Sequence, residues 1–230
     1  MVGTLYLVAT PIGNLQDITL RALETLKSAA VIACEDTRQT GKLLNHYGIS
    51  TPLISLHDHN ERQRAPQLIE RLTSGQSIAL VSDGGTPLVS DPGWLLVRHA
   101  IDAGITVSWI PGPSALTGAL VLSGLPTERF IFEGFLPVTS GRRRSRLAAL
   151  KHEARTVVLY ESPHRLLKTL NEIRDVIGDV PAACARELTK LFEEVRRGRI
   201  SELIAHFEQK APKGEFVIVL SSRNLGNSDE

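Results

Sequence analysis

The sequence predicts an α/β fold with two lobes, and three observations lead to this prediction. Short apolar runs alternate with amphipathic segments, which is the β-α-β-α order of a mainly parallel sheet covered by helices. The turn-forming segment from Pro111 to Ser114 interrupts this order near the middle of the 230 residues. Hydrophobic residues make up 42% of the chain, enough for two cores. We predict a first lobe over residues 1–113, a second over 114–222 and a disordered tail over 223–230.

Five apolar runs in the first lobe predict strands, with helices between them. The predicted strands are Leu5–Ala9, Val31–Cys34, Pro52–Leu56, Ile78–Val81 and Ile105–Ile110. Gly48, Gly75 and Gly104 stand where three of the helices would need a C-terminal glycine. Pro66 leaves the start of the third helix open. Because parallel sheets bind ligands beyond the carboxyl ends of their strands, polar residues that follow these runs are the first functional candidates.

The second lobe also alternates strands with helices, but its shorter and more closely spaced strands predict a mixed sheet. A helix of small and apolar residues is expected over 115–122, directly after the junction. The predicted strands are Phe130–Glu133, Thr156–Tyr160, Ala182–Arg186, Glu194–Arg197 and Phe216–Leu220, and the predicted helices cover about residues 142–152, 165–177 and 201–209.

Composition excludes several classes of protein. No apolar stretch reaches the ~20 residues that span a bilayer, and the N-terminus lacks a signal-peptide pattern, so we expect a cytoplasmic protein without a membrane partner. Cys34 and Cys184 show no metal-ligand or redox spacing and are expected to be buried thiols. Residues 1–113 carry 8 Lys/Arg against 10 Asp/Glu, and residues 114–230 carry 18 against 15, so the net charge is only +1. Contact with a polyanion must therefore depend on local clusters such as the arginine run 142–146.

The loop of thirteen residues from Val81 to Gly93 is the strongest functional signal in the sequence. It follows a predicted strand and contains three glycines, two prolines and two aspartates. Glycine lets the backbone approach a ligand closely, proline fixes the path, and aspartate supplies acceptors that a plain turn does not need. The loop is therefore predicted to bind a ligand.

Three further polar segments follow predicted strands of the first lobe: Thr10–Asp17, Glu35–Arg38 and His57–Glu61. The first lacks the glycine spacing and the lysine of known phosphate loops, so alone it favours a plain connection, although its backbone amides could face an anion. Asp36, Thr37 and Asn60 are also expected to cap helices. A metal site would need His57, Asp58, His59 and Glu61 to point the same way, whereas neighbours on an extended segment point to opposite faces, so we expect no metal.

Four polar clusters lie at strand ends of the second lobe: Glu133–Pro137, Tyr160–Arg165, Arg186–Lys190 and Lys213–Phe216. A single polar cluster at a strand end is common in proteins. Four such clusters, together with the polar segments that follow the strands of the first lobe, favour one binding site to which both lobes contribute. The arginine run is interpreted equally well as a solvated helix face or as an RNA contact.

Taken together, the motifs that begin at Thr10, Glu35, His57, Ser82, Glu133 and Arg186 resemble those of the ribosomal small-subunit RNA 2′-O-ribose methyltransferases, in the tetrapyrrole methylase superfamily. The resemblance runs in order from about Leu5 to Leu220. It implies two α/β lobes with S-adenosylmethionine (SAM) in the cleft between them, usually in a homodimer. It also implies methylation of the 2′-hydroxyl of a cytidine in the decoding region of 16S rRNA, presented as naked RNA or within the 30S subunit.

The resemblance assigns roles to individual residues. Cofactor contacts are implied for Pro11, Asp83, Gly84, Gly85, Thr86, Pro87, Ser114 and Ala115 and, on the adenosine side or at the cleft mouth, for Tyr160, Arg186, Lys213 and Gly214. A ribose hydroxyl is a weak acid, so a rim carboxylate or imidazole would accept its proton. The candidate acceptors are Asp36, His57, Asp58 and Glu161, and the candidate RNA-binding residues are Arg38, Arg142, Arg143, Arg144, Arg146 and Arg165.

Two features depart from the family. Gly84 stands where alanine is usual, which preserves the turn and makes it more flexible. Relatives commonly continue past the last strand into a basic helical extension, whereas this sequence ends at Glu230. Two alternative functions stay open: a SAM-dependent methylase of a tetrapyrrole or a protein side chain, and a non-catalytic SAM- or RNA-binding module.

Overall fold

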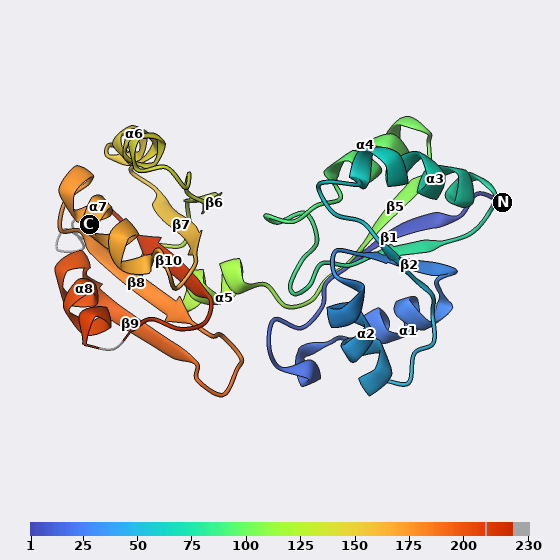
Figure 1. Cartoon of the computed structure of the whole chain (residues 1–230), viewed down its shortest axis with the longest axis horizontal. Coiled ribbons are helices and arrows are strands. Elements are labelled where there is room, and N and C mark those ends of the chain that lie inside the picture. The colour runs from blue at the N-terminus through green and yellow to red at the C-terminus, as the bar shows by residue number, and fades with distance from the viewer. Residues whose placement is uncertain (210, 223–230) are drawn as a thin grey trace. The chain divides into compact units, whose positions relative to one another are not determined.

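The computed structural model describes residues 1–209 and 211–222, and the chain divides into two compact units (Figure 1). Unit 1 is Met1–Ser114 and unit 2 is Ala115–Glu230, a boundary one residue beyond the junction predicted from the sequence. The tail predicted over 223–230 lies outside the described residues. Within the ranges that the structure describes, no helix has the length and apolar character needed to cross a membrane.

Unit 1 contains a five-stranded parallel sheet in the order β3-β2-β4-β1-β5, as the β-α-β-α pattern predicts. Its elements are β1 (Thr4–Val8), the 3-10 turn η1 (Leu15–Asp17), α1 (Leu20–Ser28), β2 (Val31–Cys34), α2 (Thr37–His46), β3 (Leu53–Ser55), α3 (Glu61–Thr73), β4 (Ile78–Leu80), α4 (Trp94–Asp102) and β5 (Thr106–Ile110). All five predicted strands are confirmed, with ends that differ by at most one residue.

Helices cover both faces of the unit 1 sheet, because successive strand residues point to opposite sides. Helices α3 and α4 cover one face, and α1 and α2 cover the other (Figure 1). Leu5 and Leu80 pack under the first pair of helices, and Val8 and Ile32 pack under the second. The sheet is therefore buried between two layers of helices, and its carboxyl edge carries the loops that could bind a ligand.

The helix ends of unit 1 follow the glycine pattern. Gly48, Gly75 and Gly104 have φ angles of +62°, +97° and +68° just beyond α2, α3 and α4, so this prediction is confirmed. The third helix begins at Glu61 and contains Pro66 in its interior. The Glu61 carboxylate accepts the amides of Leu95 and Leu96 at the start of α4, and thereby joins the two helices.

Unit 2 contains a mixed five-stranded sheet in the order β6-β7-β10-β8-β9, as predicted. Its elements are α5 (Ala115–Leu122), β6 (Phe130–Phe135), α6 (Ser140–Leu150), β7 (Thr156–Glu161), α7 (Leu166–Val176), β8 (Pro181–Arg186), β9 (Glu194–Arg199), α8 (Ile200–Glu208) and β10 (Phe216–Leu220). The central strand β10 is antiparallel to both β7 and β8, while β6 and β7 are parallel.

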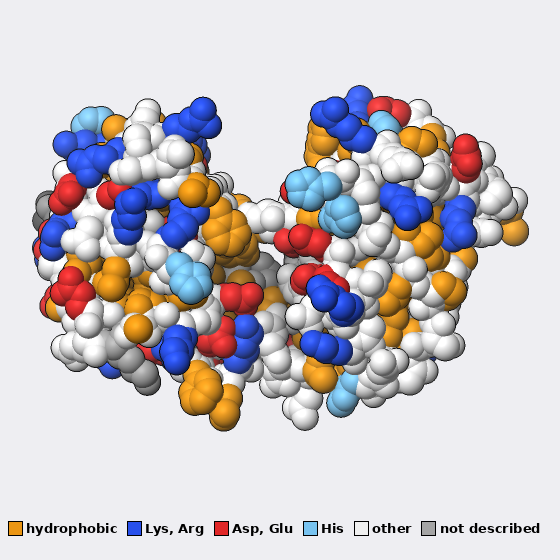
Figure 2. Space-filling model, viewed as in Figure 1, with side chains coloured by type: hydrophobic (Ala, Val, Ile, Leu, Met, Phe, Trp, Pro, Cys, Tyr) orange, Lys and Arg blue, Asp and Glu red, His pale blue; other side chains and the backbone are white. Residues whose placement is uncertain are grey.

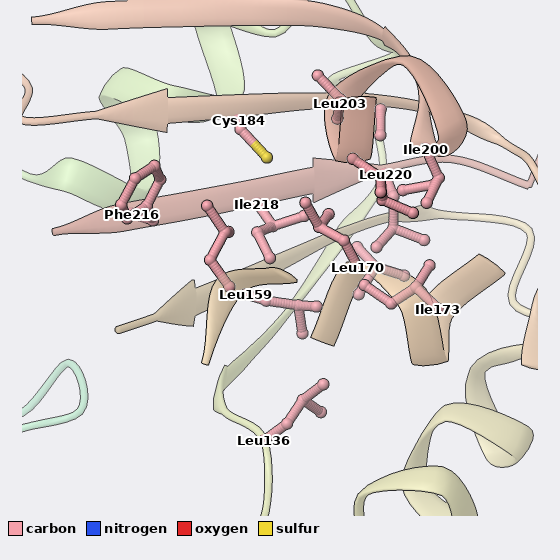
Figure 3. Close-up of a cluster of buried hydrophobic side chains, with 14 of the residues drawn as sticks. Leu136, Leu159, Leu170, Ile173, Cys184, Ile200, Leu203, Phe216, Ile218 and Leu220 are labelled. Atoms are coloured by element: carbon pink, nitrogen blue, oxygen red, sulfur yellow. The ribbon is translucent and has the colours of Figure 1, made fainter. Parts of the chain in front are cut away.

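The core of unit 2 lies between one face of this sheet and the helices α6, α7 and α8. Leu159, Cys184 and Ile218 point from three neighbouring strands into this core (Figure 3). Helix α5 packs against β8 and β10 on the unit's sheet. Cys184 in this core and Cys34 in unit 1 are both buried thiols, as the sequence predicts.

Strand β6 is longer than predicted because it contains a β-bulge at Glu133. Phe132 pairs with Val158 and Phe135 pairs with Tyr160, so the strand holds one extra residue between these pairs. Gly134 has φ +61°, the left-handed conformation that such a bulge commonly requires. The extra residue shifts the alternation, and Phe135 therefore lies on the same face as Phe132.

Candidate functional site

Three loops meet at the carboxyl edge of the unit 1 sheet. The Thr10 amide donates to the Gly85 carbonyl at 2.9 Å, and the Gly85 amide donates back to the Thr10 carbonyl at 2.8 Å. The Thr86 hydroxyl reaches the Pro113 carbonyl at 3.4 Å. The predicted unit 1 cofactor residues, Pro11, Asp83, Gly84, Gly85, Thr86, Pro87 and Ser114, thus lie on three segments that are bonded to one another.

The backbone of the loop 81–93 adopts a conformation that a plain turn would not need. Gly85 and Gly93 have φ angles of +88° and +122°, and the non-glycine residues Leu88 and Ser90 have φ angles of +70° and +69°. Each left-handed non-glycine residue costs about 1–2 kcal/mol, and such strain is concentrated at functional sites. At Gly84 a Cβ would lie 3.1 Å from the Pro11 carbonyl oxygen, so the two loops are in close contact.

Five carboxylates surround these loops and form what we call the acidic rim. They are Glu35, Asp36, Asp58, Asp83 and Asp91. The Asp83 carboxylate accepts the Asp36 amide at 3.1 Å and so joins the loops after β4 and β2. Figure 2 shows acidic side chains gathered beside histidines on unit 1.

Two members of the acidic rim, Glu35 and Asp91, are site residues that sequence reasoning did not single out. Burial raises the pKa of Asp91 to about 6, a hydrogen bond from Ser82 opposes this shift, and the charges of Glu35 and Asp83 add to it. Burial and the charge of Asp83 likewise raise the pKa of Glu35. The only sequence signal for Asp91 was its place in the loop 81–93.

The side chain of Asp36, a predicted proton acceptor, caps the N-terminus of α2. Its carboxylate accepts the Arg38 amide at 2.8 Å and the Arg38 guanidinium at 2.7 and 3.1 Å. These bonds from Arg38 lower the pKa of Asp36 to about 2. The predicted capping role is confirmed, and the low basicity makes Asp36 a poor acceptor for a hydroxyl proton.

His57 and Asp58 lie in the turn between β3 and α3. Asn60 occupies the N-cap position of α3, but its side chain makes no capping bond and instead accepts the His57 amide at 2.9 Å, so the predicted cap is wrong. The Asn60 amide nitrogen lies 3.0 Å from His57 Nε2. Among the described residues, His57 Nδ1 is buried without a hydrogen-bond partner. No group of three or more His, Cys, Asp or Glu in the described ranges is arranged to hold a metal ion.

The predicted cofactor residues of unit 2 also gather at one sheet edge. Because β10 is antiparallel to its neighbours, its first residue, Phe216, pairs with both Glu161 at the end of β7 and Arg186 at the end of β8. Tyr160 and Gly214 therefore lie at the same edge as Arg186. Gly214 has φ +88°, and a Cβ there would overlap the Glu187 side chain, so only glycine fits. Lys213 is exposed beside it, and Ala115 begins α5.

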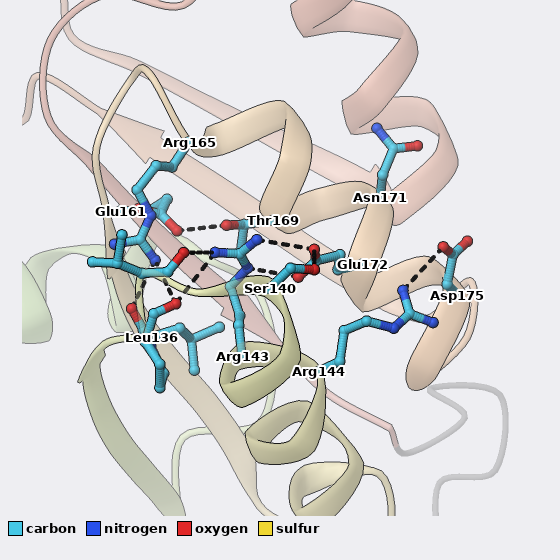
Figure 4. A network of polar contacts seen from close by, with 12 residues as sticks. Leu136, Ser140, Arg143, Arg144, Glu161, Arg165, Thr169, Asn171, Glu172 and Asp175 are labelled. Atoms are coloured by element: carbon cyan, nitrogen blue, oxygen red, sulfur yellow. Dashed lines mark hydrogen bonds and ion pairs between the residues drawn. The ribbon is translucent and has the colours of Figure 1, made fainter.

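Glu161 is unsuited to the predicted role of proton acceptor. Its side chain is buried, and its carboxylate accepts the Ser162 amide at 2.8 Å and the Thr169 hydroxyl at 2.6 Å (Figure 4). The Arg165 guanidinium lies 3.3 Å from it. These contacts fix the turn into α7, and we therefore withdraw Glu161 as a candidate acceptor.

Arg143, a predicted RNA contact, is a buried structural residue. Only 1% of its surface is exposed, and its guanidinium binds the Glu172 carboxylate at 2.6 and 2.9 Å (Figure 4). It also donates to the carbonyls of Pro137 and Val138 at 3.2 and 2.8 Å. The prediction that Arg143 contacts RNA is wrong, because the guanidinium is enclosed by unit 2.

The other arginines of unit 2 that are predicted to bind RNA differ in how far their side chains are exposed. Arg165 donates to the Leu136 carbonyl at 2.7 Å, so it holds the same loop as Arg143. Arg146 binds Glu133 at 2.6 and 2.7 Å, and Arg144 lies 3.4 Å from Asp175, but both side chains are about half exposed. Arg142 is exposed, and Lys and Arg side chains are spread over the face of unit 2 in Figure 2.

Comparison with known proteins relates this arrangement to one family. The sequence profile of the tetrapyrrole (corrin/porphyrin) methylases matches residues 4–204. The protein named ribosomal RNA small subunit methyltransferase I of Thermotoga maritima is 51% identical over 221 residues, which cover 96% of this chain and 99% of that protein. The proteins of the same name from Synechocystis and Escherichia coli O157:H7 are 53% and 50% identical, over 95% and 99% of this chain and 79% and 80% of theirs.

Solved structures share the fold at lower identity. Diphthine synthase superposes with a TM-score of 0.76 at 18% identity, over 95% of this chain and 90% of that one. Uroporphyrin-III-C-methyltransferase from Thermus thermophilus superposes with a TM-score of 0.66 at 24% identity, over 94% of each chain.

Proposed function

Since this chain belongs to the tetrapyrrole methylase family and, within it, to the group of ribosomal RNA small subunit methyltransferase I, we propose that it methylates the 2′-hydroxyl of a cytidine in the decoding region of 16S rRNA with SAM as methyl donor. The observation that carries this proposal is an identity of about half over nearly the whole chain with proteins of that name. A homodimer in the cytoplasm is part of the proposal.

The unit 1 loops suit the methionine part of SAM. The paired backbones of Thr10 and Gly85, together with the left-handed residues of the loop 81–93, bring main-chain groups close to one another without side chains between them. SAM supplies a methyl group that is already activated by the positive sulfonium. Asp83 and Thr86 would hold the donor from unit 1, and Tyr160 and Arg186 would contribute from unit 2.

We assign the proton acceptor to Asp91. A general base works best when its pKa is near the working pH, and burial raises the pKa of Asp91 to about 6. When SAM is bound, it would supply the methyl group and leave as S-adenosylhomocysteine as the methyl–sulfur bond breaks, and the Asp91 carboxylate would accept the proton of the ribose hydroxyl. His57 is the second candidate, since its Nδ1 has no hydrogen-bond partner among the described residues.

The RNA contacts are expected to be few and local. The net charge is +1, so steering by the whole molecule is weak. Arg142, Arg144 and Arg146 on α6 present exposed guanidinium groups that could bind phosphate oxygens, and Arg38 is exposed at the acidic rim.

The test is transfer of tritium from methyl-labelled SAM to 30S subunits and to naked 16S rRNA, followed by nucleoside analysis. We expect label in 2′-O-methylcytidine from at least one of the two substrates. Subunits first treated with the protein and unlabelled SAM are the matched control, and they should accept no further label. Label on a base, or RNA and SAM binding without any transfer, would contradict the proposal and favour another methylase or a binding module.

A further inference from the structure

One face of the unit 2 sheet carries a row of aromatic side chains, of which the proposed chemistry uses only Tyr160. We call it the aromatic strip, and it consists of Phe130, Phe132 and Phe135 of β6 and Tyr160 of β7. The Tyr160 ring lies 4.9 Å from that of Phe132 and 5.7 Å from that of Phe135, in edge-to-face arrangements. Phe135 is 55% exposed and Phe130 is 40% exposed, although both are large apolar residues.

The bulge at Glu133 creates the strip. In a regular strand through residues 132–135, Phe135 would stand three positions after Phe132 and point to the opposite face. With the bulge, Phe135 stands opposite Tyr160 and on the same face. The bulge thus brings a third phenylalanine to the row and leaves it 55% exposed, and a contiguous exposed apolar patch often marks an interaction site.

The buried Arg143 and the partly buried Arg165 hold the end of the strip in place. Arg143 and Arg165 donate to the carbonyls of residues 136–138, directly after Phe135 (Figure 4). Both guanidinium groups are also paired with carboxylates, Arg143 with Glu172 and Arg165 with Glu161. The segment that carries Phe135 is therefore fixed before any partner binds, which lowers the entropy lost on binding.

The other end of the strip lies at an open hollow of about 620 Å³ that contains cationic groups. The hollow is lined by Phe130, Arg129 and Arg155, together with Glu128, Glu153 and Ala154. Arg155 binds Glu153 yet stays 48% exposed. Exposed aromatic rings in a row, next to guanidinium groups, are the combination with which proteins bind unpaired bases and the phosphates that link them.

We propose that the aromatic strip is a stacking surface for an unpaired nucleobase of the substrate RNA, and that Phe135 is its principal contact. The proposal rests on the proposed function, because it takes the partner to be RNA. Phe130 and Phe135 are exposed within the strip, so an unpaired base can stack on Phe135 while the phosphates of the strand face Arg129 and Arg155.

The test is equilibrium binding of 30S subunits in the presence of S-adenosylhomocysteine, with SAM affinity measured separately by calorimetry. Phe135→Ala and Phe135→Leu should weaken 30S binding about 5- to 100-fold, because stacking on one aromatic ring is lost. Phe135→Trp, which keeps a ring, should bind within about twofold of the parent. Val138→Ala is the matched control, since Val138 is 76% exposed in the same segment but has no ring.

The outcomes separate the possible failures. If Phe135→Leu binds 30S subunits as tightly as the parent, the ring does not stack on a base and the proposal is wrong. If SAM affinity falls as much as RNA affinity, the strip holds the adenine of the cofactor instead. If the parent fails to methylate RNA while the Phe135 variants still lose 30S binding, the proposed function fails and the stacking surface stands. Melting temperatures of all variants should match, which excludes a defect in folding.

Discussion

Asp91 determines the pH dependence that we expect for methyl transfer. Its pKa of about 6, raised chiefly by burial, leaves it protonated and inactive as a base at lower pH. Single-turnover rates of the parent should therefore rise about tenfold per pH unit below about 6 and level off above it. Asp91→Asn should lower the plateau by about 10²- to 10⁴-fold with little change in RNA affinity. A variant with the parent's rate and profile would transfer the role to His57.

Stability provides the control for the Asp91 variant. The folded-state pKa of Asp91 is raised above its ordinary value of 3.8, so the folded protein prefers the neutral carboxyl. The stability that this group contributes is fully present below pH 3.8 and is lost as the pH rises through about 6. At pH 8 the neutral asparagine should therefore leave the urea midpoint equal to or above that of the parent, and a lost activity cannot be ascribed to unfolding.

Several residues that the sequence suggested for function are structural, and one of them could have been recognised. In a helix over 140–150, Arg143 shares a face with Leu147 and Leu150, which are both buried. The helical period thus predicts that Arg143 points inward while its neighbours face solvent. Glu161 gives no such signal, because its bonds to Thr169 and Arg165 depend on how β7 and α7 pack.

At the scale of elements, the buried ion pair of Arg143 and Glu172, which joins α6 to α7, is expected to contribute strongly to the stability of unit 2. Arg143→Met should destabilise the protein by about 3–5 kcal/mol, because it leaves the Glu172 carboxylate buried without its partner. Arg144→Met, next to it, should change stability by less than about 0.5 kcal/mol, since its contact with Asp175 is exposed. Urea denaturation at pH 7 measures both.

The difference in stability between the parent and Arg143→Met should depend on pH, which gives a second measurement of the ion pair. The hydrogen bond from Arg143 holds the pKa of Glu172 below its ordinary value of 4.5. The stability that the pair contributes is present above pH 4.5 and is lost as the pH falls through the folded-state pKa, so parent and Arg143→Met should converge in acid. If the Arg143 and Arg144 substitutions changed the stability equally at pH 7, the buried ion pair would not contribute specially to the stability of unit 2.

The elements themselves could be predicted from the sequence far better than their pairing. Apolar runs locate most of the strands that the structure describes, because such runs bury side chains in a core, whereas the run that predicts β9 is largely charged and has no fully buried residue. The central place of β10 between β7 and β8 depends on contacts between residues far apart in the chain, which no local pattern encodes. The bulge at Glu133 was missed for a related reason, since a charged residue and a glycine are also typical of a strand end.

At the scale of the whole molecule, some parts of the candidate site follow from the order of strands and helices along the chain, and these could be predicted. The parts that depend on how distant segments pack could not. The unit 1 cofactor loops follow parallel strands, so their meeting at one edge followed from the β-α-β-α order. The aromatic strip and the charge environment of Asp91 depend on register and burial, and the sequence did not show them. The sequence therefore predicted the meeting of the unit 1 loops better than the burial of Asp91 or the aromatic strip.

If both units contribute to the SAM site, SAM should stabilise each of them, because a ligand stabilises whatever must be folded to bind it. Leu26→Ala and Leu170→Ala are matched core substitutions in unit 1 and unit 2, and each should cost about 2–5 kcal/mol. SAM at about 100 times its Kd should recover about 2.7 kcal/mol in both variants. Hydrogen exchange resolved by peptide would report the opening of each unit. Protection of unit 1 alone would mean that unit 2 takes no part in holding the methyl donor, and Tyr160 and Arg186 would then lose their assigned role.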